Sequence, residues 1–330
     1  MLPMTETSHP ILSTIKPVVD ASKHVHIHEM AIEAVSEWMA YESLPWPDFR
    51  FPVIPDGPDG NDADTMDFIF LTASINFAFT DFDRHVVFST NYGGTERWDS
   101  DAMMACLKRA YDAGTPILEG QYLAGVDRTD LERIFTGNIE MPMLDERVEI
   151  FHELGAVLKE HYEGRFHNFL KAGPRTTSAA VERLIETFPS FRDESQYRGQ
   201  RVAFQKRAQL LLWQLHARFR SDGYFALHDP DELTVFADYI VPVALRVLGI
   251  TSYTDELEDA INARKIIPRD SEEEIEIRAA TIWACHLLTR AINERRPADR
   301  QVIDPVVDTR LWTHYHETHW PHHLTVTTAY

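Results

Sequence analysis

The stretch "TVFADYIVPVAL", residues 234–245, places one carboxylate, Asp238, among apolar residues, and Pro242 follows it. Pro242 has no N–H to donate to the carbonyl of Asp238, and its ring clashes with that carbonyl. A helix that begins near Asp231 should therefore end near Tyr239. A second helix can begin at Pro242, because proline suits the first helical position. Asp238 would then lie at the N–H-rich, positively polarised start of that helix, where a carboxylate can stay ionised.

Two functions of Asp238 fit this position. In the first, the carboxylate only caps the second helix, by accepting hydrogen bonds from its first N–H groups. It can also be a catalytic carboxylate, because its apolar neighbours and the helix start together give it an unusual environment. The spacing of the residues leaves both interpretations open.

Two adjacent cations, Lys206 and Arg207, interrupt residues 201–219, which are otherwise apolar nearly all round. A helix with that pattern is buried in the centre of a protein. A long basic side chain can reach solvent past apolar neighbours, so either residue could do that alone. The pair could also hold a phosphate group or form an ion pair with Asp238.

Histidines supply a competing hypothesis. His24, His26 and His28 would share one face of an extended segment. A second group near the C-terminus consists of His314, His316, His319, His322 and His323. A zinc hydrolase needs three protein ligands and an open position for water. Because no HExxH motif or comparable spacing occurs, we expect no metal and keep a zinc-dependent hydrolase as an alternative.

Helical patterns cover most of the chain. Apolar residues at three- and four-residue spacing, bounded by capping residues, glycine or proline, predict helices over residues 29–42, 100–114, 143–164, 177–188, 201–219, 254–264 and 271–293. Strand patterns are confined to the N-terminal part, at residues 84–94 and within 65–79. We therefore predict a mainly α fold with a few short strands. Residues 1–330 should form a single domain, and a small N-terminal lobe over residues 1–98 is the alternative.

Composition narrows the class of protein. The 330 residues are 44% hydrophobic, which suffices for a large core, and the net charge of −20 disfavours long nucleic acids and anionic membranes. Cys106 and Cys285 lie in apolar helical patterns and make no disulfide framework or thiolate metal cage. The start of the chain lacks the features of a signal peptide, and no apolar run reaches the length of a membrane span. We expect a cytoplasmic protein.

Several blocks resemble a known family. They are "MDFIFLTASINFAF", "FPSFRDESQYRGQRVAFQKRAQLLLWQL", "FADYIVPVALRVLGITSYTDEL", "EEIEIRAATIWA", "DTRLWTHY" and "PHHLTVTTAY", in this order along nearly the whole chain. Together they resemble the queuosine salvage proteins, the queuosine 5'-phosphate N-glycosylases. The resemblance implies a hydrolase that releases queuine from queuosine 5'-monophosphate and leaves ribose 5-phosphate, so that the base can re-enter tRNA modification. It also implies a helical fold similar to the helix-hairpin-helix DNA glycosylases, a mononucleotide substrate and no cofactor.

The resemblance also implies roles for individual residues. The aspartate of the family's "ADYxVP" motif is its catalytic carboxylate, which is Asp238 here, and the "KRAQ" lysine is Lys206. Breaking the bond between ribose and base builds positive charge on the sugar, which a fixed carboxylate can stabilise or attack. The substrate-binding residues that it implies are Asn76, Phe77, Phe204, Tyr239, Asp308, Thr309, Trp312, Thr313 and His323.

Some of these positions have alternatives of their own. Phe77 could be a core residue instead of stacking on the base, and Asp308 could be a helix N-cap instead of a partner for the cationic secondary amine of queuine. His322 or His323 could help hold the phosphate. The chain departs from the family pattern at Phe51, Thr80 and Thr313, where relatives have histidine, tryptophan and an acid. A non-catalytic nucleotide-binding module is the remaining alternative function.

Overall fold

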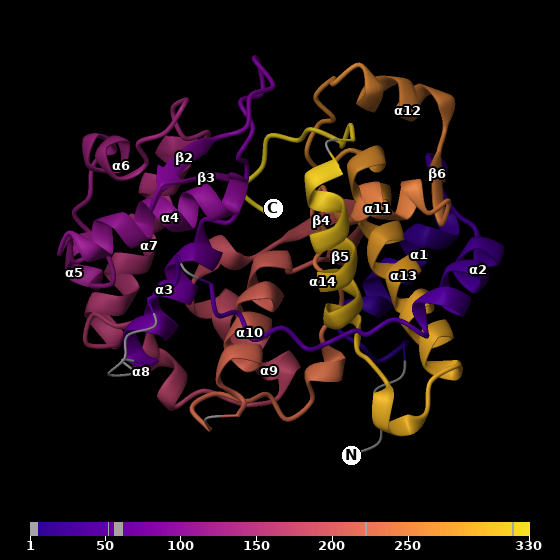
Figure 1. The fold of residues 1–330 in the computed structure, drawn as a ribbon, viewed down its shortest axis with the longest axis horizontal. Helices are drawn as coiled ribbons and strands as arrows, with labels where there is room; N and C mark the ends of the chain where they lie inside the picture. Colours follow the sequence, from indigo (N-terminus) through magenta and orange to yellow (C-terminus); the bar gives the residue numbers. More distant parts are fainter. Residues whose placement is uncertain (1–5, 52, 56–61, 222, 319) are drawn as a thin grey trace.

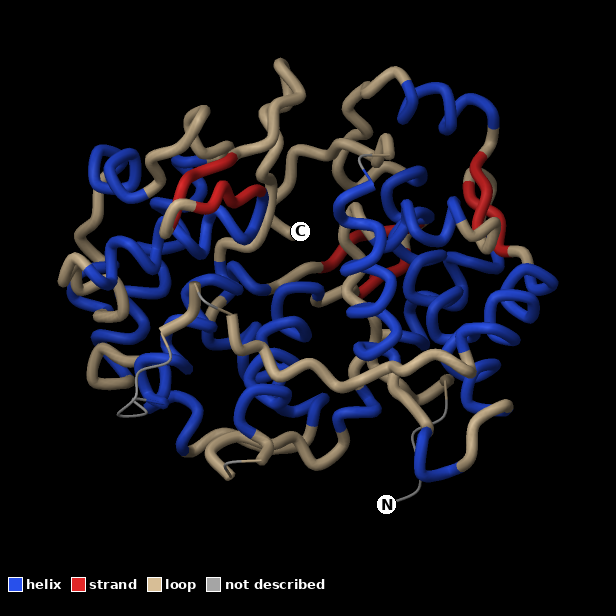
Figure 2. The backbone as a smooth tube through the Cα atoms, in the orientation of Figure 1, coloured by secondary structure: helices blue, strands red, loops and turns tan. Residues whose placement is uncertain are grey.

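The computed structural model describes residues 6–51, 53–55, 62–221, 223–318 and 320–330. Within this part the fold is mainly α-helical, as predicted (Figures 1 and 2). The α-helices are α1 (Leu12–Ala21), α2 (Glu29–Met39), α3 (Asp62–Ser74), α4 (Asp99–Asp112), α5 (Gly120–Leu123), α6 (Arg128–Ile134), α7 (Leu144–His161), α8 (Phe166–Lys171), α9 (Thr177–Thr187), α10 (Lys206–Phe219), α11 (Val241–Val247), α12 (Asp255–Asn262), α13 (Glu272–Glu294) and α14 (Asp304–Tyr315).

The strands form three short antiparallel pairs, drawn in red in Figure 2. They are β1 (Val25–Ile27) with β6 (Thr251–Tyr253), β2 (Ser89–Tyr92) with β3 (Thr95–Trp98), and β4 (Glu194–Tyr197) with β5 (Gln200–Ala203). Strand β2 confirms the strand predicted within residues 84–94, and β4, β5 and β6 lie beyond the N-terminal part in which strands were predicted. The β4–β5 hairpin turns at Arg198 and Gly199, whose φ angles of 49° and 83° suit the tight turn that joins right-twisted strands.

Two segments differ from their predictions, and in the first of them, α3, the cause is burial on all sides. Residues 65–79 were predicted to hold a strand, but the segment begins as helix α3, in which every residue from Thr65 to Ser74 is buried. The predicted helix 201–219 begins only at Lys206, after β5 and after Gln205, whose φ is 52°. A segment that is buried on all sides has no polar face, so its hydrophobic period cannot separate helix from strand.

The segment before Asp238 also differs from its prediction. Residues Pro230–Glu232 form one 3₁₀ turn, and no α-helix runs from Asp231 to Tyr239. The N–H of Phe236 instead donates to Asp308 Oδ2 at 2.9 Å, so a tertiary hydrogen bond replaces a helical one. The predicted second helix is confirmed, because α11 begins at Val241 with proline in its first turn.

Most helices pack around one extensive core that runs from residues of α1 to residues of α14, and α12 packs on α13 and β1 in a second, smaller cluster. Helices α1 and α2 lie against α13, and β1 pairs with β6, so N-terminal residues contact C-terminal ones. Figure 1 shows α3 to α8 on one side, α11 to α14 with α1 and α2 on the other, and α10 between them. The single domain and the N-terminal lobe both stay predictions. Both cysteines are free and buried, as predicted, and no described helix has the length and hydropathy needed to cross a membrane.

Candidate active site

A cavity of about 890 Å³, called the site cavity below, opens between the two sides of the molecule. Its walls come from the end of α3, the start of α4, helices α10 and α14, and the loop that crosses from α2 to α3 (Figure 1). Its volume falls within the usual range for small-molecule sites. The predicted site residues that line it are Asn76, Lys206, Asp238, Asp308, Thr309, Trp312 and Thr313.

Asp238 lies at the wall of this cavity and is 7% exposed. Its Oδ1 accepts hydrogen bonds from the N–H groups of Ile240 at 2.8 Å and Val241 at 3.0 Å, at the start of α11. Within the described residues, Oδ2 has no hydrogen-bond donor. Burial raises the pKa of Asp238, and the positive charge of Lys206 and the two N–H groups oppose that rise. One oxygen of the carboxylate thus caps the helix, and the other is not engaged.

Lys206 is the first residue of α10 and is buried, with 4% exposure. Its backbone N–H donates to Asp193 Oδ2 at 3.0 Å, while its Nζ has no hydrogen bond or ion pair among the described residues. Burial lowers the pKa of Lys206, and the charge of Asp238 is the largest influence that raises it. A buried, unpaired ammonium at a cavity wall is costly unless an anionic or polar ligand joins it.

Arg207 has a different role from its neighbour. It is 2% exposed, so the prediction that one of the two cations reaches solvent is wrong. Its guanidinium donates to the backbone carbonyls of Ser74 and Ser190. Arg207 therefore joins α10 to the end of α3, and only Lys206 faces the site cavity.

Asp308 faces the same cavity from the second turn of α14. The helix starts at Asp304, so the alternative that Asp308 is its N-cap is wrong. Burial raises the pKa of Asp308 well above the ordinary value, and the negative charge of Asp238 adds to the rise. A cationic group bound between these two acids would relieve the repulsion and favour the ionised forms.

The remaining predicted residues of the site cavity come from α14 and from the loop that follows α3. Thr309, Trp312 and Thr313 project into the cavity from successive turns of α14, and the Trp312 ring stacks on His316 with centroids 4.2 Å apart. Asn76 follows α3, in a loop whose carbonyls at Ile75, Phe77 and Ala78 accept hydrogen bonds from buried Arg147. The loop that holds Asn76 is thus fixed from behind.

The structure does not bring Phe77 or Phe204 to the site cavity. Phe77 is fully buried under the guanidinium of Arg147, 4.3 Å from its ring centroid, which agrees with the alternative that it belongs to the core. Phe204 is 1% exposed, and Arg278 lies 3.9 Å from its ring centroid. Both rings pack behind the cavity wall instead of forming its surface.

Tyr239 and His323 also lie elsewhere. Tyr239 lines a neighbouring cavity of about 350 Å³, where its hydroxyl donates to the carboxylate of Asp99 and its ring stacks on His322. His323 is 2% exposed, and its Nε2 lies 3.1 Å from the hydroxyl of Tyr330. Burial lowers the pKa of His323 to about 3, so its imidazole is neutral at pH 7 and brings no positive charge to a phosphate.

Sequence reasoning missed most of the aromatic wall. Phe49, Trp98 and Trp213 line the site cavity, as does Phe51, one of the departures from the family pattern. These rings come from the crossing loop, from the end of β3 and from the middle of α10. Trp98 could have been suspected from its place directly before a helix start. The others belong to segments with no shared spacing, so only the fold assembles them.

The histidines do not gather as the zinc alternative requires. In the described residues, the group with metal-ligand spacing is His24 with Glu272 and Glu276. Glu276 already accepts hydrogen bonds from Ser22, Lys23 and His24, and Arg198 is bonded to Glu272. In the second group, His316 stacks on Trp312 and His322 on Tyr239, and His319 lies outside the described residues.

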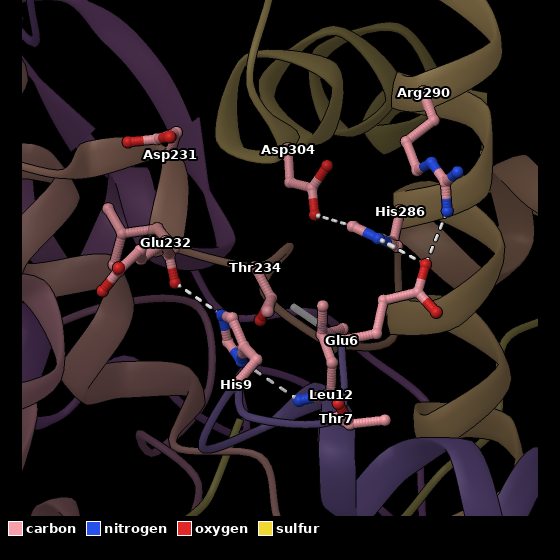
Figure 3. A pocket seen from close by; sticks show the side chains of 11 residues that line it. Glu6, Thr7, His9, Leu12, Asp231, Glu232, Thr234, His286, Arg290 and Asp304 are labelled. Carbon is pink, nitrogen blue, oxygen red and sulfur yellow. Dashed lines mark hydrogen bonds and ion pairs between the residues drawn. The ribbon is translucent and has the colours of Figure 1, made fainter. Parts of the chain in front are cut away.

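Another cavity, of about 480 Å³, lies between the N-terminal segment, residues 231–234, and residues of α13 and the start of α14 (Figure 3). There His286 lies between the carboxylates of Asp304 and Glu6, with nitrogen–oxygen distances of 3.3 and 3.6 Å, and Arg290 pairs with Glu6. Its lining residues are distinct from those of the site cavity. None of the predicted site residues lines this cavity, so we place the candidate active site in the site cavity.

Comparison with known proteins shows the family of this chain. Residues 57–330 match the family model described as queuosine salvage protein. A queuosine 5'-phosphate N-glycosylase/hydrolase from Sphaerobacter thermophilus is 38% identical over 303 residues, which are 92% of this chain and 91% of that protein. Proteins of the same name from Mus musculus and Schizosaccharomyces pombe are 28% and 32% identical, over 91% and 77% of this chain and 91% and 76% of their own. The chain therefore belongs to the queuosine salvage protein family.

Proposed function

We propose that this protein hydrolyses the N-glycosidic bond of queuosine 5'-monophosphate, releasing queuine and ribose 5-phosphate for queuine salvage toward tRNA modification. The observation that carries the proposal is the joint placement of Asp238 and unpaired Lys206 at the wall of one aromatic-lined cavity, in a chain of this family. In the overall reaction, water supplies a hydroxyl to the anomeric carbon and a proton to the departing base.

Asp238 is the residue that we assign to the anomeric centre. As the bond to the base breaks, positive charge develops on the ribose, and a fixed carboxylate nearby stabilises it. The two N–H groups that hold Oδ1 orient the carboxylate before substrate arrives, so little reorganisation is needed. The carboxylate either stabilises the sugar cation or bonds to it, and water completes hydrolysis in both cases.

The other wall residues suit the base and the sugar phosphate. Trp98, Trp213 and Trp312 offer flat apolar surfaces for a heteroaromatic base. Asp308 would pair with the cationic secondary amine of queuine, which restores charge balance beside Asp238. Phe51 and Thr313 line this cavity at two positions where the family pattern differs, so we expect contacts to the base to vary there.

We also propose that the ligand is a small molecule and not a polynucleotide, and that the protein acts in the cytoplasm. The net charge of −20 repels the phosphate backbone of a long nucleic acid, whereas one buried lysine suffices for one small anion. The two buried free thiols fit a reducing compartment.

The direct test is turnover by the wild-type protein. Incubation with queuosine 5'-monophosphate in the presence of a chelator is expected to release free queuine, detected by mass spectrometry. Activity that disappears with chelator and returns with zinc would support the zinc hydrolase instead. Tight binding of the nucleotide without any release of base would support the non-catalytic module.

The activity should depend on pH through two groups, Asp238 on the acidic side and Lys206 on the basic side, each with a pKa shifted from its ordinary value. Burial raises the pKa of Asp238 above the usual carboxyl value of about 3.9. Activity that needs the ionised carboxylate should therefore be lost as the pH falls through this raised pKa. Burial lowers the pKa of Lys206 below its usual value of about 10.4. Activity that needs the ammonium should therefore be lost as the pH rises through this lowered pKa. A profile of kcat/KM against pH is the measurement. In the Lys206→Met variant the acidic limb should move further up, because Lys206 lowers the pKa of Asp238; a downward shift would contradict this assignment.

A further inference from the structure

A buried arginine connects the two segments that carry Asp238 and Lys206. Arg278, on α13, is 1% exposed and donates to both oxygens of Asp193, at 2.9 and 2.6 Å. Its Nε donates to the carbonyl of Ala237 at 3.2 Å, directly before Asp238. One guanidinium thus bonds both to the carboxylate of Asp193 and to the backbone directly before Asp238.

Asp193 completes the connection on the other side. Its Oδ2, which accepts from Arg278, also accepts the backbone N–H of Lys206 at 3.0 Å. Its own carbonyl accepts the N–H groups of Phe204 and Gln205, at 3.0 and 3.1 Å. The first turn of α10 is therefore fixed to Asp193, and through Arg278 it is fixed to the residue before Asp238.

The surroundings allow Arg278 little freedom. Its guanidinium lies 3.9 Å from the ring centroid of Phe204 and 4.5 Å from that of Tyr330. The hydroxyl of Tyr330 donates to Glu274 at 3.0 Å, and Glu274 lies 3.7 Å from Arg278. A planar, five-donor guanidinium fits this arrangement, whereas a lysine ammonium has no fork to bridge Asp193 and no plane to stack between rings.

We propose that Arg278 and Asp193 are positioning residues, which set the separation and orientation of Lys206 and Asp238 without touching substrate. The proposal rests on the proposed function. It explains why Phe204, which was predicted to bind the base, lies behind the wall: the ring packs on the guanidinium that holds the site together. A misplacement of reacting groups by about 1 Å can cost a factor of about 10² in rate.

The test is Arg278→Lys, with Asp193→Asn as the second variant. Each folded variant is expected to lose about 10- to 100-fold in kcat, with KM changed less than about threefold, because the cavity walls that bind substrate stay in place. In an Asp238→Asn background, Arg278→Lys should lower the residual rate by no more than about twofold, since the group that it positions is already disabled. Arg165→Lys is the matched control; Arg165 bonds to Asp67, which is 2% exposed, and joins α8 to α3.

The outcomes separate the two proposals. Wild-type protein that releases no queuine would defeat the proposed function. Active wild type with Arg278→Lys and Asp193→Asn equally active would overturn the positioning role alone. Losses that multiply fully in the Asp238→Asn background, or loss of the folded state in both variants by circular dichroism, would also overturn it in favour of a purely structural role.

Discussion

Asp238→Asn is expected to lower kcat by at least about 10²- to 10³-fold while the protein stays folded. Losing one preorganised charge from a dry site typically costs about 2.7–4 kcal/mol in the barrier. Asparagine keeps an oxygen that can accept from the N–H groups of Ile240 and Val241, so the start of α11 stays capped. Only the negative charge is removed. The measurement is kcat for queuine release, with the melting temperature recorded in parallel.

This variant separates the two interpretations that the spacing of residues left open. If Asp238 only capped α11, asparagine would retain turnover, and Asp238→Ala would lose about 0.5–2 kcal/mol of stability. If the charge is catalytic, alanine and asparagine should both lose turnover. We expect Asp238→Ala to fold as well, and an unfolded alanine variant would instead support the capping role.

Asp304→Asn is the matched control for this experiment. Asp304 is a similarly buried carboxylate on α14, at 7% exposure, but it faces the other cavity and lies beside His286 (Figure 3). Its removal should leave kcat within about twofold of wild type. A loss in this variant comparable with that of Asp238→Asn would mean that buried acids affect turnover through stability alone.

Lys206→Met is expected to lower kcat/KM by about 10²-fold without loss of stability. Methionine matches the length of the side chain and removes a buried ammonium that has no ion-pair partner in the described residues. An unpaired buried charge carries a desolvation cost that methionine does not have, so the folded state should not be weakened. The loss should appear in turnover because the positive charge of Lys206 is the largest influence that lowers the pKa of Asp238.

Two substrates show which group Lys206 serves. If the ammonium contacts the 5'-phosphate, the loss should be larger for queuosine 5'-monophosphate than for the unphosphorylated nucleoside. If it acts through Asp238 and the sugar, the two substrates should lose equally. Lys108→Met, which removes a lysine paired with Asp112 on α4, is the control. Kinetics of Lys206→Met indistinguishable from this control would remove Lys206 from the site.

Burial of Asp238 and Lys206 affects both the stability of their charged forms and their action on substrate. Burial raises the pKa of Asp238 and lowers that of Lys206, so each group is less stable in its charged form than it would be in water. Buried charges act strongly on a charged substrate, because little water screens them. Removing either charge should therefore disfavour turnover while the protein stays folded.

The sequence by itself determined the parts of this protein that depend on neighbouring residues. Pro242 marked the start of α11 and thereby the position of Asp238 at a helix start, because proline acts on the residues directly around it. The mainly helical fold followed from apolar spacing, and the resemblance of ordered blocks indicated the family. In α3 the same reasoning failed, because residues 65–74 are buried on every face and leave no hydrophobic period that separates helix from strand.

Only the tertiary structure decided which side chains meet. Lys206 and Arg207 are adjacent in sequence, yet one faces the site cavity and the other bonds to carbonyls behind it. Phe204 was predicted to bind substrate and instead packs on Arg278, and no spacing in the sequence connects Arg278 with Asp193 and Ala237. Contacts between distant segments depend on how whole helices pack, since a side chain's partner is set by the angle and position of its helix.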